Sequence, residues 1–211
     1  YYLEAKRPTE EVNFKQLFGP RELTLDLGHF RLKYPVTGFS QINESQIHNL
    51  IKAASRLMGL TSEDKFLDLY CGYGLFSFAL GEAAKSVLGV EWEGPSIESA
   101  KASAKFLKKN YRFVAGKIDE NFVQMRLPRP VQGECEKILL DPPRKGCEPG
   151  VIHAIAQRHP VRVVHVFCGT DEIPVALKEW ERYGYRVRDV QPLDLFPGTP
   201  HLETLIALER K

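Results

Sequence analysis

The chain has 211 residues with 43% hydrophobic composition, which is enough for one sizeable globular core and a small appendage. Its 29 Lys and Arg against 27 Asp and Glu give a formal charge of +2, too small to indicate a nucleic-acid partner from bulk charge. No apolar stretch reaches the length of a membrane span and no signal peptide opens the chain, so we expect a cytoplasmic protein without a membrane partner.

Residues 1–36 contain two short alternating stretches, "RELTLDLG" and "HFRLKYPV", which predict a small β element. We expect residues 1–36 to be a small N-terminal segment left from a longer upstream region, since the first residue is not Met, and residues 37–211 to be the main domain. From Ser40 onward the apolar residues recur at helical spacing, and Ser40 is the expected N-cap of that helix.

The rest of the chain alternates between buried strands and helices, which predicts a parallel, doubly wound α/β sheet. The expected strands are "KFLDLYCG", "SVLGVEW", "YRFVAGK", "EKILLDPP" and "VRVVHVFCG", and the expected helices lie around 75–84, 94–109, 148–158 and 171–182. Two closing runs, "YRVRDVQPLDL" and "TLIALERK", predict a C-terminal antiparallel hairpin at the sheet edge. Five parallel strands with such a hairpin resemble the seven-stranded, mostly parallel sheet of Rossmann-like methyltransferases.

A glycine turn and an acidic strand end follow the first two of these strands. In "DLYCGYG", Gly72 and Gly74 let the backbone approach a ligand at the switch point of the sheet, beside Asp68. The second strand ends at Glu91, where a carboxylate can accept both hydroxyls of a ribose. Each feature alone has an ordinary structural explanation: the glycines could simply form a tight turn, and Glu91 could be a solvated carboxylate. Their occurrence together and in this order favours nucleoside binding.

The fourth strand ends in "DPPRKG", which places Asp141 at the carboxyl edge of the sheet before two stiffening prolines. This arrangement favours a site, with a helix cap as the alternative. A similar element occurs in amino-directed methyltransferases, where an aromatic residue follows the prolines. Here Arg144 follows them, which weakens the amino-directed interpretation.

The fifth strand carries a cysteine, Cys168, at its end and directly before a glycine. A cysteine at this place is either a small packing residue or a nucleophile in the ligand crevice. None of the four cysteines shows CxxC or Cys/His spacing, so the sequence supports neither a zinc site nor an iron–sulfur cluster.

The motifs "FSQIN", "DLYCGYG", "GVEW", "DPPRKG", "VFCG" and "LDLFPGTPHLET" occur in the order in which the uracil-C5 RNA methyltransferase family has them. Over residues 17–211 the chain resembles the catalytic domain of that family. The resemblance implies a class I, S-adenosylmethionine-dependent methyltransferase that acts on RNA. We expect the protein to be a monomer. The ending "HLET" is more similar to the branch acting on 23S ribosomal RNA than to the transfer-RNA branch.

The resemblance also implies roles for individual residues. Cys168 is expected to add to carbon 6 of uracil, which makes carbon 5 nucleophilic, and Glu203 is expected to remove the carbon 5 proton afterwards. The implied cofactor-binding residues are Gln41, Asp68, Tyr70, Gly72, Glu91, Asp119 and Asp141. The implied substrate-binding residues are Arg144, Thr199 and His201. Cys168 as a packing residue and Glu203 as an edge-strand carboxylate remain the alternatives.

The chain departs from the family pattern at two places. Lys117 stands where the family usually has an acidic residue, so Asp119 is expected to replace it. The nucleophile is followed by Gly169 and Thr170 in place of the family's Asn-Pro, which leaves a degenerate, non-catalytic RNA-binding module as an alternative beside the amino-directed methyltransferase. The family's cluster-binding cysteines and N-terminal RNA-binding barrel have no counterpart in this sequence.

Overall fold

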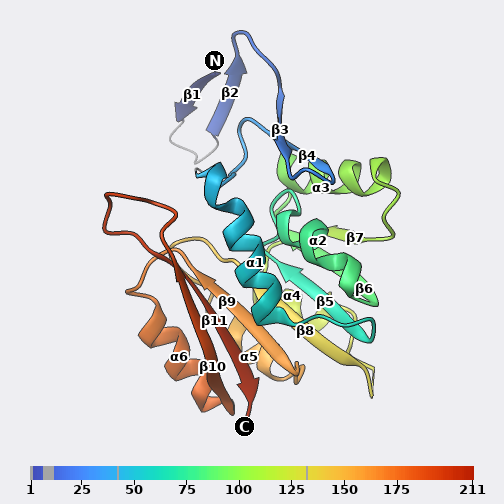
Figure 1. Ribbon diagram of the computed structural model, residues 1–211, viewed down its shortest axis with the longest axis vertical. Helices are drawn as coiled ribbons and strands as arrows, with labels where there is room; N and C mark the ends of the chain where they lie inside the picture. The colour runs from blue at the N-terminus through green and yellow to red at the C-terminus, as the bar shows by residue number, and fades with distance from the viewer. Residues whose placement is uncertain (1, 7–11, 42, 132) are drawn as a thin grey trace.

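The computed structural model describes residues 2–6, 12–41, 43–131 and 133–211, with side chains from residue 16 onward. Among the described residues, seven strands form one sheet in the order β10-β11-β9-β8-β5-β6-β7 (Figure 1). The strands are β5 (Asp64–Leu69), β6 (Ser86–Glu91), β7 (Arg112–Ala115), β8 (Cys135–Leu140), β9 (Arg162–Phe167), β10 (Tyr185–Leu193) and β11 (Glu203–Arg210).

The pairing confirms the predicted sheet. Strand β5 pairs in parallel with β6 and β8, and the outer pairs β6–β7 and β8–β9 are also parallel. The chain passes from β7 back across β5 to β8, so the topological switch point lies between β5 and β8, where ligands bind in sheets of this kind. The C-terminal hairpin closes the sheet, because β11 pairs antiparallel with both β9 and β10.

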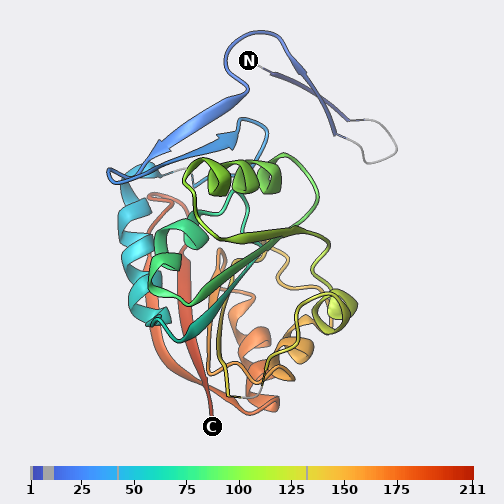
Figure 2. The ribbon, with the colours of Figure 1, turned by 90° about the vertical axis from the view of Figure 1, so that its right-hand side faces the viewer.

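Helices cover both faces of the sheet (Figures 1 and 2). The core on one face contains buried residues of α1 (Ile47–Met58), α2 (Leu75–Leu80) and α3 (Pro95–Phe106). The core on the other face contains residues of α4 (Glu120–Met125), α5 (Val151–Ala156) and α6 (Ile173–Arg182). Successive residues of β8 serve opposite faces, since Leu139 packs in the first core and Ile138 and Leu140 in the second.

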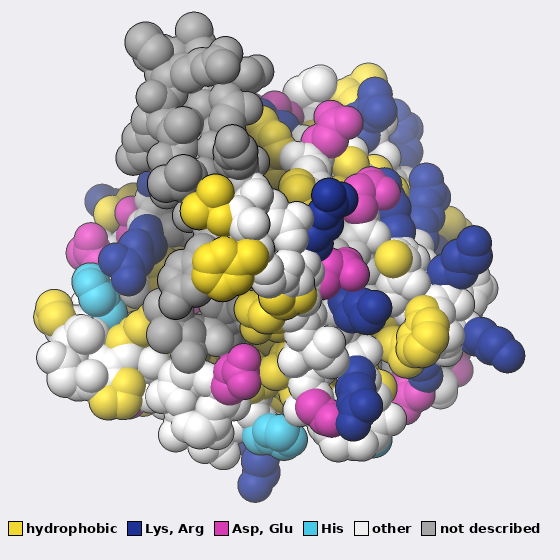
Figure 3. Space-filling model, turned by 90° about the horizontal axis from the view of Figure 1, so that it is seen from above, with side chains coloured by type: hydrophobic (Ala, Val, Ile, Leu, Met, Phe, Trp, Pro, Cys, Tyr) yellow, Lys and Arg dark blue, Asp and Glu magenta, His cyan; other side chains and the backbone are white. Residues whose placement is uncertain are grey.

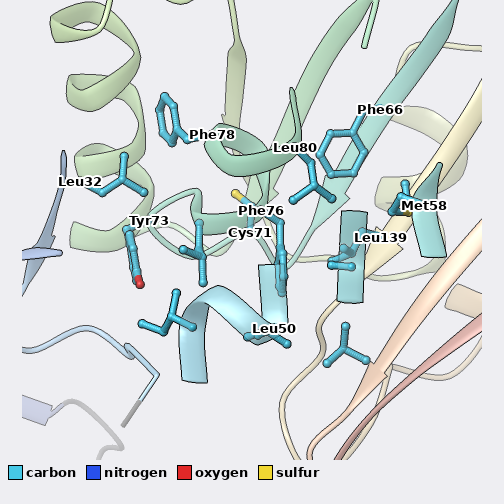
Figure 4. Packing of buried hydrophobic residues seen from close by; sticks show 14 of the residues in the cluster. Leu32, Leu50, Met58, Phe66, Cys71, Tyr73, Phe76, Phe78, Leu80 and Leu139 are labelled. Carbon is cyan, nitrogen blue, oxygen red and sulfur yellow. The ribbon is translucent and has the colours of Figure 1, made fainter. Parts of the chain in front are cut away.

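The N-terminal β element is confirmed as an antiparallel hairpin of β3 (Glu22–Asp26) and β4 (Arg31–Pro35). Its buried side chains Leu25, Leu32 and Tyr34 belong to the same core as α1 and α2, and Figure 4 shows Leu32 near Tyr73 and Phe78 in this cluster. A second hairpin, β1 (Tyr2–Lys6) with β2 (Val12–Gln16), precedes it.

Two details of the predicted helices are wrong. Ser40 is not a helix N-cap, because α1 begins at Ile47 after a 3₁₀ turn, η1 (Glu44–Gln46), and the Ser40 hydroxyl instead lies 3.2 Å from the Tyr73 hydroxyl. The six-residue helix α4 was not predicted.

A second 3₁₀ turn, η2 (Gly81–Ala83), continues α2. No helix in the described part of the chain is both long and apolar enough to cross a membrane.

Candidate active site at the switch point

A cavity of about 710 Å³ opens where β5, β6, β8 and β9 end and β11 begins. Eight of the residues predicted from the sequence line it: Gln41, Tyr70, Gly72, Glu91, Asp141, Arg144, Cys168 and Glu203. These residues come from segments far apart in the sequence, and the strand order brings them to one edge of the sheet. The other four, Asp68, Asp119, Thr199 and His201, do not belong to its lining.

The glycine turn after β5 is tied to the end of β6 through Glu91. One carboxylate oxygen of Glu91 accepts a hydrogen bond from the Gly72 N–H at 2.8 Å, and the other accepts from the Trp92 N–H at 2.7 Å. Gly72 has φ +56° and Tyr70 has φ +64°, so the backbone turns through left-handed conformations directly at the cavity wall. Because a carboxylate has about four acceptor positions, Glu91 can hold the turn and still accept from a ligand.

Asp68 lies behind this turn, fully buried at the end of β5. The Ser77 hydroxyl donates a hydrogen bond to its Oδ2 at 2.6 Å, whereas its Oδ1 has no partner among the described residues. Burial, together with the nearby Glu91 charge, raises the pKa of Asp68 to about 7. Asp68 therefore connects β5 to α2 beneath the cavity.

The segment that carries Gln41 reaches the cavity from the N-terminal side. Gln41 is 8% exposed and lines the cavity with its neighbours Phe39 and Ser40. The contact of Ser40 with the Tyr73 hydroxyl holds this segment against the glycine turn. Tyr73 in turn stacks on Tyr34 of β4 at 5.1 Å between ring centroids. The β3–β4 hairpin thereby contributes to the position of one cavity wall.

Cys168 and Glu203 lie close to each other where β9 ends and β11 begins. The antiparallel register of β9 and β11 ends with the pair Phe167 and Thr204; Cys168 directly follows β9, and Glu203 is the first residue of β11. Both side chains line the cavity, and the Glu203 charge contributes to the pKa of the Cys168 thiol. The thiol and the carboxyl group therefore share one end of the cavity, although 35 positions of sequence separate them.

The pKa values at this end of the cavity are raised. Burial raises the pKa of Glu203, which is 2% exposed, to about 7, and the Arg144 guanidinium acts in the opposite direction. Burial also raises the pKa of the Cys168 thiol; the charges of Glu203 and Asp141 add to this effect and that of Arg144 opposes it. The pKa of Asp141 is raised well above its usual value, first by burial and then by neighbouring carboxylates that include Glu203. The cavity is thus rich in carboxyl groups and is chemically suited to a cationic ligand.

Three of the predicted residues outside the lining have structural contacts. The Asp119 carboxylate caps α4 by accepting a hydrogen bond from the Phe122 N–H at 2.8 Å. The Thr199 hydroxyl donates a hydrogen bond to the Phe196 carbonyl at 2.8 Å. The His201 ring packs edge-on against the Phe196 ring, with 6.3 Å between the ring centroids. Phe196 itself lines the cavity, so Thr199 and His201 shape the loop that places it.

Three aromatic side chains of the cavity were not among the residues predicted from the sequence. Phe39 and Trp92 are 69% and 59% exposed, and both line the cavity together with Phe196. Each stands within a quoted motif, Phe39 in "FSQIN", Trp92 in "GVEW" and Phe196 in "LFPGTP", and this position is the signal that could have identified them.

Seen from above, the molecule exposes hydrophobic side chains among interspersed acidic and basic ones (Figure 3). Within the described residues, no group of three or more His, Cys, Asp or Glu side chains is placed to hold a metal ion.

Comparison with known proteins gives a consistent result. A family model described as tRNA (Uracil-5-)-methyltransferase matches residues 5–211. The chain is 36% identical over 215 residues to a Clostridium acetobutylicum protein named an uncharacterized RNA methyltransferase, with 95% of this chain and 46% of that protein covered. It is 33% identical over 191 residues to the 23S rRNA (uracil(1939)-C(5))-methyltransferase of Marinomonas sp., with 88% and 41% covered. The chain thus spans less than half the length of these relatives.

Among solved structures, the chain is similar to the Pyrococcus abyssi tRNA (uracil-54, C5)-methyltransferase in complex with S-adenosyl-L-homocysteine. The TM-score is 0.77 and the sequence identity 24%, with 98% of this chain and 50% of that chain covered. At this identity the likeness establishes the fold, which is that of a class I methyltransferase with an α/β architecture.

Proposed function

Because the chain belongs to the tRNA (uracil-5-)-methyltransferase family, we propose that it catalyses methylation of carbon 5 of a uridine in RNA, with S-adenosylmethionine as methyl donor. The observation that carries this proposal is that Cys168, directly after β9, and Glu203, the first residue of β11, both line the switch-point cavity. Residues 37–211 form the catalytic domain in this proposal, and residues 1–36 form the small N-terminal β segment. The ending "HLET" and the Marinomonas relative favour 23S ribosomal RNA as the substrate.

The residues present fit S-adenosylmethionine. Its sulfonium and ammonium groups are cations, and the cavity has carboxyl groups of Glu91, Asp141 and Glu203 in its lining. Glu91 is suited to the ribose hydroxyls, and in this proposal Gln41 and Tyr70, which line the same cavity, contact the amino acid end. The volume of about 710 Å³ lies in the range of small-molecule sites. When bound, the cofactor supplies an electrophilic methyl group.

Replacement of Glu91 by alanine is expected to weaken cofactor binding about 10- to 150-fold. The reason is that the loss of a charged hydrogen-bond acceptor costs about 1.5–3 kcal/mol, and each 1.4 kcal/mol is a factor of about ten in affinity. Titration calorimetry with S-adenosylhomocysteine measures this loss. Glu93→Ala is the matched control, because Glu93 is exposed and does not belong to the cavity lining.

Since Glu91 also accepts hydrogen bonds from two backbone N–H groups, Glu91→Gln should be measured alongside. This variant keeps one acceptor oxygen and is expected to bind more tightly than Glu91→Ala. Unchanged affinity in Glu91→Ala, with the unfolding temperature preserved, contradicts the assignment of Glu91 to the ribose.

The thiol of Cys168 provides the nucleophile. Carbon 5 of uracil is too weak a nucleophile to take a methyl group, but addition of the thiolate to carbon 6 produces an enolate with electron density on carbon 5. Burial raises the pKa of Cys168 and the Arg144 charge opposes that rise, so in this proposal Arg144 supports the thiolate and, from the same lining, is suited to stabilise the enolate oxygen. This role needs a thiol in the cavity wall, and Cys168 lies there, directly after β9.

Glu203 completes the reaction as a base. After methylation, carbon 5 carries both the methyl group and a proton; removal of that proton re-forms the double bond between carbons 5 and 6 and breaks the carbon–sulfur bond. A general base works best when its pKa lies near the working pH, and the pKa of Glu203 is about 7. Because Glu203 and Cys168 line the same cavity, the base and the leaving thiol can act on the same uracil ring.

The proposal is tested by mass spectrometry of nucleosides from cells that lack the gene for this protein. We expect one 5-methyluridine to disappear from 23S ribosomal RNA and to return when the gene is restored. Loss from transfer RNA instead reassigns the substrate, and unchanged 5-methyluridine in both RNA classes rejects the activity. The amino-directed alternative predicts the loss of a methylated amino group.

A further inference from the structure

A second, small hollow adjoins the cavity beside Cys168, which lines both. It shares Pro142, Pro143, Arg144, Gly146 and Cys168 with the cavity, and it adds Val166, Phe167, Gly169 and Glu172. Its volume is about 10 Å³, which is room for one polar group at the edge of a ring and not for a whole ring. The charged side chains in its lining are those of Arg144 and Glu172.

Glu172 has no role in the reaction described above. It lies directly before α6, is half-buried, and has neither a hydrogen bond nor an ion pair from its carboxylate among the contacts of the described residues. Its carboxylate lies against the loop that follows β8, because a Cβ added at Gly146 would be 2.3 Å from Glu172 Oε2. Gly146 also has φ +75°, so glycine serves both the turn and the close approach of the carboxylate.

The chemistry of uracil indicates what such a carboxylate would bind. Within the ring, N3 is the atom opposite carbon 6, so the edge with N3–H points away from the thiol that adds to carbon 6. N3–H is a donor between two carbonyl acceptors. An ionised carboxylate only accepts hydrogen bonds and a guanidinium only donates them, so Glu172 and Arg144 complement this edge.

We propose that Glu172 accepts the N3–H of the target uracil and is a specificity-determining residue of the site. The inference rests on the function proposed above. The residue after the nucleophile supports it: the family commonly has Asn there, whereas Gly169 has no side chain to meet the base and leaves Glu172 as part of the hollow's wall. Cytosine has an unprotonated N3 with a lone pair, which a carboxylate repels, so the same contact favours uracil over cytosine.

The experiment measures binding of base analogues to the 211-residue chain saturated with S-adenosylhomocysteine, by NMR titration. The probes are 1-methyluracil, 1,3-dimethyluracil, which lacks N3–H, and 1-methylcytosine. We expect the unmodified protein to bind 1-methyluracil about tenfold more tightly than either of the others, as for a charge-assisted hydrogen bond of ordinary strength. In Glu172→Gln, the preference for 1-methyluracil over 1-methylcytosine is expected to fall to about one, because an amide can present either a donor or an acceptor.

Glu179→Gln is the matched control, since it removes a half-buried carboxylate from the same helix outside the hollow, and it should keep the tenfold preference. The preference for 1-methyluracil over 1-methylcytosine is a ratio of two affinities of the same protein, so a change in overall stability does not alter it. Glu172→Ala provides the same test if Glu172→Gln does not fold. Equal binding of the three probes to the unmodified protein, or an unchanged preference in both Glu172 variants, overturns the proposal. Neither result affects the proposed function, which the covalent complex through Cys168 tests separately.

Discussion

Replacing Cys168 by alanine is expected to abolish both methyl transfer and the formation of a covalent complex with RNA. Without the thiolate there is no addition to carbon 6, and carbon 5 stays too weakly nucleophilic to react. The measurement uses 23S ribosomal RNA transcripts in which 5-fluorouridine replaces uridine. Fluorine at carbon 5 blocks the final elimination, so the unmodified protein should remain attached to RNA on a denaturing gel, and Cys168→Ala should show no such band.

The matched control is Cys135→Ala. Cys135 is also a partly buried free thiol, but it lies at the start of β8, at the opposite end of that strand from the cavity. It should form the complex at the rate of the unmodified protein. Full activity of Cys168→Ala on a confirmed substrate would falsify the carbon 5 mechanism and leave Cys168 as a packing residue.

The same experiment separates the alternatives that the sequence leaves open. An amino-directed methyltransferase does not add a thiol to carbon 6, so it forms no complex with 5-fluorouridine RNA. A non-catalytic RNA-binding module binds RNA without the covalent band and without any methyl transfer. Only the carbon 5 mechanism predicts a complex that survives denaturation and depends on Cys168.

The sheet could be predicted from the sequence because its strands are buried on both faces. The second half of β8 (ILL) and most of β9 (VVHVF) are buried and, apart from His165, apolar, and several such short runs alternating with helical stretches are typical of parallel strands covered by helices. The residues directly after such strands lie at one edge of the sheet whatever the details of packing. For this reason Gly72, Asp141 and Cys168 could be placed together at the cavity from sequence alone.

The closeness of Cys168 and Glu203 could not be predicted in this way. It depends on the register of β11 against β9, and β11 is positioned by a hairpin whose other strand has an irregularity between Val187 and Asp189. A shift of one residue would turn Glu203 to the other face of the sheet. Sequence resemblance indicated a role for Glu203, but the pKa of about 7 follows from burial, which only the folded chain provides.

A polar residue type alone does not determine what its side chain contacts in the folded chain. Ser40 has the residue type of an N-cap, yet its hydroxyl contacts Tyr73 and the helix begins seven residues later. Asp119 was expected at the cofactor because an acidic residue was missing at Lys117, whereas its carboxylate caps α4. That helix has only six residues, and its place depends on burial of Phe122 and Val123, so periodicity alone did not reveal it.

Replacing Glu203 by glutamine is expected to stall the reaction after methylation, with the RNA still attached to the protein. The amide has no basic oxygen for the carbon 5 proton, so elimination should slow by about 10²- to 10⁴-fold, while Cys168 still adds. With ordinary uridine-containing RNA and radiolabelled cofactor, a denaturing gel should show a slowly migrating labelled band for Glu203→Gln and none for Cys168→Ala. Glu209→Gln, a partly buried carboxylate on the same strand that pairs with Arg162, is the matched control and should release its product normally.

The pH dependence gives a second, independent signature of the same role. Glu203 must be deprotonated to act as a base, and burial raises its pKa to about 7, so product release by the unmodified protein should accelerate as the pH rises from about 6 to 8. In Glu203→Gln this dependence of the release step should disappear, because the titrating group is gone. A labelled band that decays equally fast in both proteins, with the same pH profile, would show that another group removes the carbon 5 proton and that Glu203 is an edge-strand carboxylate.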